Sequence, residues 1–147
     1  MTVSKKEYQN MAKKASPAST YGRDMLLAFL FGGTICMLGQ CILNLYRFWG
    51  LDEKSASAFV SITLIGLSAL LTALRVYDNL AKYGGAGTLV PITGFANSIV
   101  APAMEFKSEG FVLGIGAKMF VIAGPVLVYS TAASILYGLI LWFFRLY

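Results

Sequence analysis

The chain has 147 residues and a formal net charge of +5, with 57% apolar or aromatic residues and 13% charged residues. Soluble globular proteins average about 45–50% apolar and about 25% charged residues, so this composition excludes an ordinary soluble domain and favours a membrane protein. Histidine is missing from the sequence, which excludes imidazole-based triads, proton shuttles and most catalytic zinc sites.

Residues 1–24 form a polar, basic tail. Four lysines and Arg23 outnumber Glu7 and Asp24, and a Ser/Pro/Thr-rich hinge is expected at residues 16–20. The basic part is too long for a signal peptide, and the apolar run that follows has no Ala-x-Ala cleavage pattern. We expect a cytoplasmic tail, because it carries more basic residues than the first loop. Its modest charge suits anionic lipid rather than nucleic acid.

Two uncharged stretches follow, at residues 25–46 and 55–74. Each matches the roughly 20 residues that cross about 30 Å of hydrocarbon as a helix. Tyr46 and Trp49 stand near the intervening turn, where aromatic side chains favour the membrane interface. These features predict a helical hairpin. Cys36 and Cys41 point to opposite sides of the first helix, so we expect neither a mutual disulfide nor a shared metal.

A third uncharged stretch, residues 83–104, contains several glycines and prolines. These residues interrupt regular helix, and backbone groups freed inside lipid need protein or water as partners, so this stretch is predicted to be broken or re-entrant. A polar connector at residues 105–110 leads to a final span at about residues 119–144, which contains Pro125. A full crossing by residues 83–104 gives four spans, and a re-entrant loop gives three; charge counting leaves both open.

The sequence therefore predicts an all-α integral membrane protein. It has three to four transmembrane helices and one broken or re-entrant segment rich in Gly and Pro. The organisation is a tail of residues 1–24 followed by a membrane domain of residues 25–147.

Both hairpin helices carry a narrow polar face at a helical spacing of about 100° per residue. Such side chains ordinarily form hydrogen bonds between packed helices. Alternatively, several copies of the chain arrange these faces around a polar conduit. The residues concerned are Gln40 and Asn44 on the first helix, near Cys36 and Arg47, and Ser57, Ser61, Ser68, Thr72 and Arg75 on the second.

The broken segment is the more unusual feature. Thr88 is a candidate cap for a half helix with Pro91 near its first turn, and an exposed helix start of this kind suits an anion. The alternative is an interface loop whose glycines only permit close packing. Lys118 is flanked by apolar residues and should face protein or a pore if it lies inside the membrane. The candidate path residues are Gly85, Gly87, Thr88, Pro91, Thr93, Gly94, Asn97, Ser98 and Lys118.

Four stretches of the sequence resemble a known family. They are AFLFGGTICMLGQ at residues 28–40, ALLT at 69–72 followed by Tyr77 and Asp78, GAGTLVPITGFANS at 85–98, and KSEGFVLG at 107–114. They resemble the stage V sporulation protein AC/AEb family of endospore-forming bacteria. The basic tail and the Lys-Ser-Glu-Gly connector resemble the AC branch of that family.

The resemblance implies membership of a complex in the spore inner membrane. That complex moves dipicolinic acid, as its calcium chelate, into the developing spore and out at germination. The implied partners are the AEb membrane protein and the soluble, thiolase-like AD protein, and the AC branch is expected to respond to membrane tension.

The leading functional hypothesis is a pore-forming or pore-lining subunit of a homo- or hetero-oligomer, because three or four helices are too few to enclose a path for such a solute. The alternative is a non-conducting membrane anchor or scaffold that recruits a soluble partner. An enzyme is not expected: Asp78, Glu105 and Glu109 show no spacing typical of a dyad, and Ser and Cys lack a histidine base. The sequence predicts no catalytic residue, cofactor or metal site.

Overall fold

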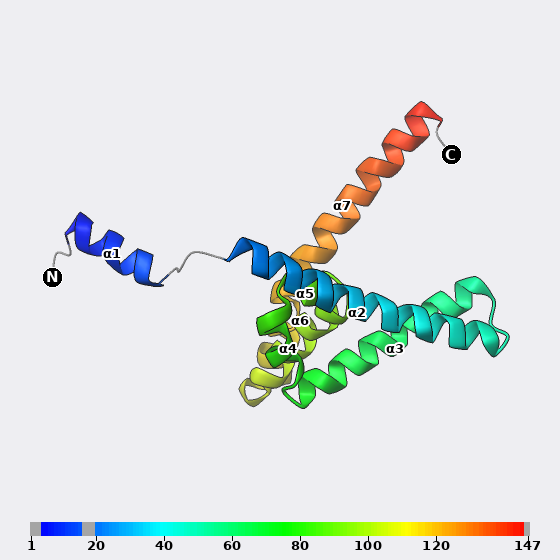
Figure 1. The fold of residues 1–147 in the computed structure, drawn as a ribbon, viewed down its shortest axis with the longest axis horizontal. Helices are drawn as coiled ribbons and strands as arrows, with labels where there is room; N and C mark the ends of the chain where they lie inside the picture. The colour runs from blue at the N-terminus through cyan, green and yellow to red at the C-terminus, as the bar shows by residue number, and fades with distance from the viewer. Residues whose placement is uncertain (1–3, 16–19, 146–147) are drawn as a thin grey trace.

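A computed structural model describes residues 4–15 and 20–145, and all the regular structure in these residues is helical (Figure 1). This confirms the predicted all-α fold; most of the predicted hinge, residues 16–19, lies outside the described residues. The elements are α1 (Lys5–Ala15), α2 (Tyr21–Phe48), α3 (Glu53–Ala73), α4 (Tyr77–Gly84), α5 (Ala86–Leu89), α6 (Ile92–Glu105), the 3₁₀-helix η1 (Lys107–Glu109), the π-helix η2 (Phe111–Gly116) and α7 (Phe120–Phe144).

Three helical stretches of the described chain are long and apolar enough to cross a membrane: Tyr21–Phe48, Glu53–Ala73 and Phe111–Phe144. The first two form an antiparallel hairpin. The Tyr46 hydroxyl and Thr63 Oγ1 lie 2.7 Å apart across it, and Asp52 caps the start of α3 by accepting a hydrogen bond from the Ser55 backbone N–H. Hydrogen bonds from the side chain and backbone of Ser55 lower the pKa of the Asp52 carboxyl, which lies in the loop between the spans.

The segment that follows α3 turns back on itself. Ser68 Oγ donates to the Thr93 carbonyl oxygen at 2.6 Å, and Thr72 Oγ1 lies 2.8 Å from Asn97 Oδ1. Both pairs are separated by 25 residues along the chain, so α6 runs parallel to α3. The segment therefore begins and ends near the C-terminal end of α3, which is the geometry of a re-entrant segment rather than a full crossing.

Glycines let this re-entrant segment approach α2. A Cβ on Gly87 would overlap the Ala28 carbonyl oxygen, and a Cβ on Gly32 would lie 3.3 Å from the Gly87 Cα. A Cβ on Gly94 would overlap the carbonyl oxygens of Thr88 and Leu89 where α6 begins. The short helix α5 thus rests on the N-terminal half of α2 through backbone contact, which side chains at these positions would prevent.

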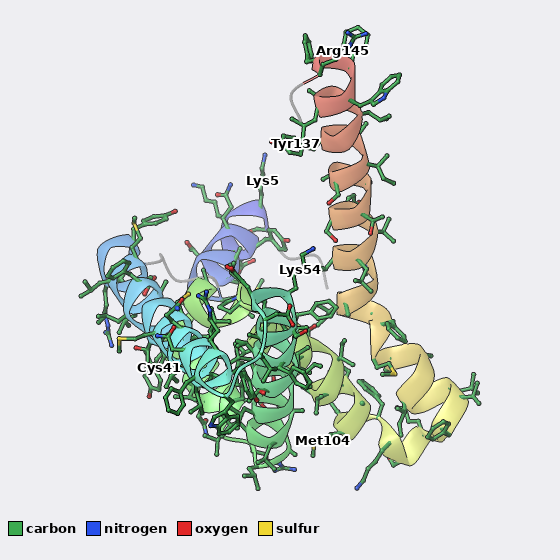
Figure 2. The ribbon with its side chains drawn as sticks, turned by 90° about the vertical axis from the view of Figure 1, so that its right-hand side faces the viewer. Lys5, Cys41, Lys54, Met104, Tyr137 and Arg145 are labelled. Atoms are coloured by element: carbon green, nitrogen blue, oxygen red, sulfur yellow. The ribbon has the colours of Figure 1, made fainter. Side chains whose placement is uncertain are left out.

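Helix α7 leaves this body and runs back in the opposite general direction to α3 (Figures 1 and 2). It is continuous through Pro125, and its large side chains are exposed along its length, as at Tyr137 and Trp142. Figure 2 shows the side chains of its C-terminal half pointing into open space. An apolar helix of this kind is stable in lipid or against another membrane helix.

Candidate functional site

A buried cluster of hydroxyl groups lies where the re-entrant segment meets α3 and α4. The Tyr77 hydroxyl is 2.8 Å from the Thr88 carbonyl oxygen and 2.9 Å from Thr93 Oγ1. Tyr77, Thr88 and Thr93 are all buried. Because only short turns separate α4, α5 and α6, one side chain at the start of α4 reaches both α5 and α6. The Tyr77 hydroxyl therefore connects α5 to α6 through hydrogen bonds.

Two side chains of α3 extend this cluster. Ser68 bonds to the Thr93 backbone, and Thr72 Oγ1 lies 2.7 Å from the Ser68 carbonyl oxygen as well as close to Asn97. Among the described residues, no buried side-chain oxygen or nitrogen lacks a hydrogen-bond partner. The hydroxyls of Ser68, Thr72, Thr88 and Thr93 are thus satisfied within the chain, which supports the packing alternative for these four.

The predicted half-helix cap is wrong. Thr88 lies inside α5, where its Oγ1 donates to the Gly85 carbonyl oxygen at 2.9 Å. The residue that precedes α6 is Pro91, which makes no side-chain cap. The chain has already turned at Gly85, whose φ of +48° lies in the left-handed region, so α5 inserts a helical turn before α6 can start.

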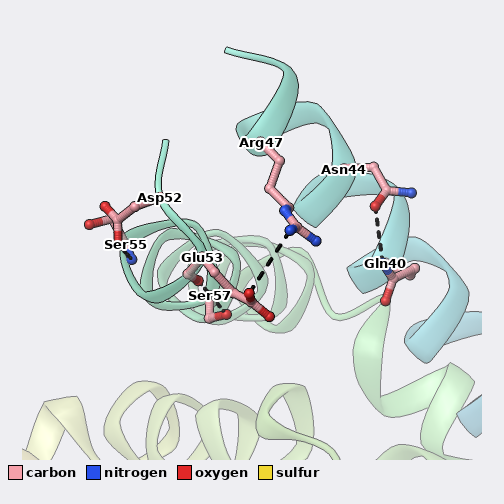
Figure 3. A network of polar contacts seen from close by, with 7 residues as sticks. All are labelled: Gln40, Asn44, Arg47, Asp52, Glu53, Ser55 and Ser57. Carbon is pink, nitrogen blue, oxygen red and sulfur yellow. Dashed lines mark hydrogen bonds and ion pairs between the residues drawn. The ribbon is translucent and has the colours of Figure 1, made fainter. Parts of the chain in front are cut away.

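The polar face of α2 has a different environment. Gln40 Nε2 donates to Asn44 Oδ1 at 3.0 Å, and both side chains are exposed (Figure 3). Arg47, one turn further along, lies 3.9 Å from Glu53 of α3. In the described part of the chain, neither amide has a hydrogen bond to another helix. This bond leaves Gln40 Oε1 and Asn44 Nδ2 unused. On a membrane helix, these two groups require a polar partner outside this chain, either protein or water.

The remaining candidate residues lie outside the buried hydroxyl cluster. Ser61 is half-buried and donates to the Ser57 carbonyl oxygen, and Ser98 donates to that of Phe95. Gly85, Gly87, Pro91 and Gly94 form the backbone turn of the re-entrant segment, where they shape contacts and carry no polar side chain. The structure therefore brings Ser68, Thr72, Thr88, Thr93 and Asn97 together, and separates them from Gln40 and Asn44.

Lys118 lies between η2 and α7, and its Nζ is 4.8 Å from the centre of the Phe106 ring, a cation–π contact. The 25 residues of α7 reach about 37 Å at 1.5 Å per residue, which exceeds the hydrocarbon thickness without Lys118. The lysine thus faces protein at one end of the span. The two cysteines are free thiols exposed on α2.

Two cavities accompany these residues. An apolar groove of about 350 Å³ lies between α2 and α3, with Tyr77, Thr88 and Thr93 among its lining residues. A polar pocket of about 360 Å³ lies at the C-terminal ends of α3 and α6. Sequence reasoning missed Tyr77 as a functional candidate, because a tyrosine just beyond a span ordinarily lies at the membrane interface. The signal that the sequence offers is its place, with Asp78, among the residues that resemble the family.

Comparison with known proteins decides the family. Residues 24–140 match the model of the SpoVAC/SpoVAEB sporulation membrane protein family. The chain belongs to this family. It is also 43% identical over 146 residues to the stage V sporulation protein AC of Bacillus subtilis (strain 168), covering 99% of this chain and 97% of the relative. No solved structure matches the chain. The family match, together with the apolar helices, establishes a multi-pass sporulation membrane protein.

Proposed function

We propose that this protein is a non-enzymatic subunit of a channel complex in the spore inner membrane. The complex moves dipicolinic acid, as its calcium chelate, into the developing spore and releases it at germination in response to membrane tension. The membrane protein AEb and the soluble protein AD are its proposed partners. The similarity to stage V sporulation protein AC and the family resemblance support this assignment.

The observation that carries the proposal is the exposed amide pair on α2. Gln40 and Asn44 bond to one another and, within the described residues, to no other helix. Since lipid provides no hydrogen-bond partners, several copies of the chain, or this chain with AEb, place this face toward one another and toward water. Three spans are too few to enclose a solute path alone, so the path forms between subunits.

The proposed orientation follows from the basic tail. The tail precedes α2 and carries most of the basic residues of the N-terminal half, which favours a cytoplasmic N-terminus. Three spans and one re-entrant segment then leave the C-terminus on the opposite side of the membrane. Lysines of the tail attract anionic lipid at the cytoplasmic surface.

The test is release from liposomes. The full chain, reconstituted alone and together with AEb, should release enclosed calcium dipicolinate when the membrane is stretched osmotically. A double variant, Gln40→Leu with Asn44→Leu, should reduce this release about tenfold or more at equal protein content. Met37→Leu is the matched control, because Met37 is 66% exposed on the same helix. Equal release by the double variant would contradict the proposed path.

The second candidate is a non-conducting anchor or scaffold. The closed hydrogen-bond cluster of the re-entrant segment favours it, because the Thr88 hydroxyl donates to the Gly85 carbonyl oxygen and the buried Thr93 hydroxyl accepts from Tyr77, both within the chain. Vesicles that stay tight under tension with AEb present, while still capturing the soluble AD protein at their surface, would select the scaffold over the channel.

A further inference from the structure

The end of α2 shows one way in which this fold terminates a helix. The backbone N–H of Gly50 donates to the Arg47 carbonyl oxygen at 3.0 Å, and that of Leu51 donates to Tyr46 at 3.2 Å. This pair of bonds is the Schellman motif, which requires a left-handed residue after the helix. Gly50 has a φ of +89° and meets the requirement without steric cost.

The end of α3 has the same motif with arginine in place of glycine. The backbone N–H of Arg75 donates to Thr72 and that of Val76 donates to Leu71, both at 2.9 Å. Arg75 has a φ of +58°, a region that a residue with a Cβ disfavours. Glycine would end α3 as it ends α2, with less strain. A left-handed arginine also ends α7, at Arg145 with a φ of +51°, so the surroundings of Arg75 rather than its backbone conformation must indicate a use for its side chain.

Arg75 lies at a polar pocket at the C-terminal ends of α3 and α6. The lining also includes Lys107, Asp78, Glu105 and Thr72. Its volume of about 360 Å³ lies within the range of small-molecule sites, about 300–1,000 Å³. The four charges come from the α3–α4 link, α4, α6 and η1, and thus converge only in the folded chain.

These charges form no direct ion pair with one another in the described chain. Among the described residues, the single ion pair within 4.0 Å joins Arg47 and Glu53, at the opposite end of α3. The pocket thus presents two cations and two carboxylates, none within 4.0 Å of an opposite charge in the described chain. A ligand that carries both signs of charge is complementary to this arrangement, and a simple anion or cation is not.

We propose that this charged pocket binds the calcium chelate of a small dicarboxylate. The Arg75 guanidinium and the Lys107 ammonium bind the carboxylate oxygens, and Asp78 and Glu105 provide hard oxygen ligands to the calcium ion that the ligand brings. The choice of dipicolinate as this ligand rests on the proposed function. The pocket lies on the same side of the membrane as the start of α2, so it would receive solute from the side of the basic tail.

The matched helix ends provide the test. The full chain in lipid nanodiscs would be compared with Arg75→Gly and Gly50→Arg, with dipicolinate binding measured by equilibrium dialysis in excess Ca²⁺. Arg75→Gly should raise the unfolding midpoint, because it removes strain, and weaken binding about tenfold or more. Gly50→Arg should lower the midpoint and leave binding unchanged. Wild-type binding by Arg75→Gly, or no dipicolinate binding by the wild type, would overturn the proposal.

Two further variants test the role of calcium in binding. Asp78→Asn combined with Glu105→Gln should abolish the gain in dipicolinate affinity that Ca²⁺ gives to the wild type, while Lys107→Gln weakens binding with and without Ca²⁺. A calcium gain that survives in the double variant would overturn the assignment of these carboxylates. Binding needs no transport, so Arg75-dependent binding by a protein that releases nothing from liposomes would support the pocket and contradict the proposed channel.

Discussion

The two helices of the hairpin both carry polar side chains, but the fold uses them in opposite ways. On α3, Ser68 and Thr72 are buried and bond to the re-entrant segment. On α2, Gln40 and Asn44 are exposed and bond to each other. The difference arises because α6 packs along one polar face and no described element packs along the other. One polar face thus builds the subunit, and the other is left for a partner or for water.

Replacing Gly87 should have the largest effect on stability, because a side chain at this position forces the re-entrant segment away from α2. In Gly87→Val the new side chain overlaps the Ala28 carbonyl oxygen, and backbone cannot move aside as a side chain can. We expect a loss of about 3 kcal/mol or more in stability, and loss of solute release, with membrane insertion unchanged. Thermal unfolding and fractionation measure these quantities.

The control for this change is Gly33→Val, since nothing lies within 4 Å of a Cβ at that position of α2. Wild-type stability in the Gly87→Val protein would show that α5 does not rest on α2.

Removing the Tyr77 hydroxyl should have the next largest effect and tests the buried cluster directly. Tyr77→Phe leaves the Thr88 carbonyl oxygen and the Thr93 hydroxyl without this partner in a buried place. We expect a loss of about 1–3 kcal/mol in the free energy of unfolding, measured by denaturant titration in detergent. Tyr83→Phe on the same helix is the control, because Tyr83 is 62% exposed. Equal midpoints for the two variants would argue against a stabilising cluster.

Changing the exposed face of α2 should weaken assembly while the subunit stays folded. Asn44→Leu removes an amide that makes no inter-helix bond within the described chain, so the unfolding midpoint should stay close to that of the wild type. Loss of an intersubunit hydrogen bond should cost about 1 kcal/mol per contact in association. Crosslinking yield against protein-to-lipid ratio measures this change, and an unchanged yield would show that the face does not contact another subunit.

The smallest effect should come from the ion pair between the hairpin helices. Arg47 and Glu53 are 3.9 Å apart, with side chains 52% and 77% exposed. Exposed pairs contribute about 0–1 kcal/mol, so Glu53→Gln should change stability by less than about 0.5 kcal/mol. A larger loss in thermal unfolding would mean that this pair contributes more to the hairpin than an exposed ion pair should, alongside the contact between Tyr46 and Thr63.

Much of the architecture could be predicted from the sequence because lipid imposes simple requirements. Uncharged runs of about 20 residues form helices in a bilayer, and the glycines and prolines of residues 83–104 predict a break in any helix there. The family followed from the glycine-rich run and the connector. The roles of single residues within the break did not follow. The sequence predicts Thr88 as a cap, but the turn at Gly85 places it inside α5 instead.

The sequence by itself determined an all-helical membrane protein and the positions of its polar residues, since composition and periodicity depend on the local chain alone. Its motifs, and not its composition, indicated the family. Only the tertiary structure decided which polar face is satisfied within the subunit, because the bonds from Ser68 and Thr72 join residues 25 apart. It also decided that Arg75 shares a pocket with Lys107, Asp78 and Glu105. Neither result has a local signature, because the parallel packing of α6 on α3 creates both.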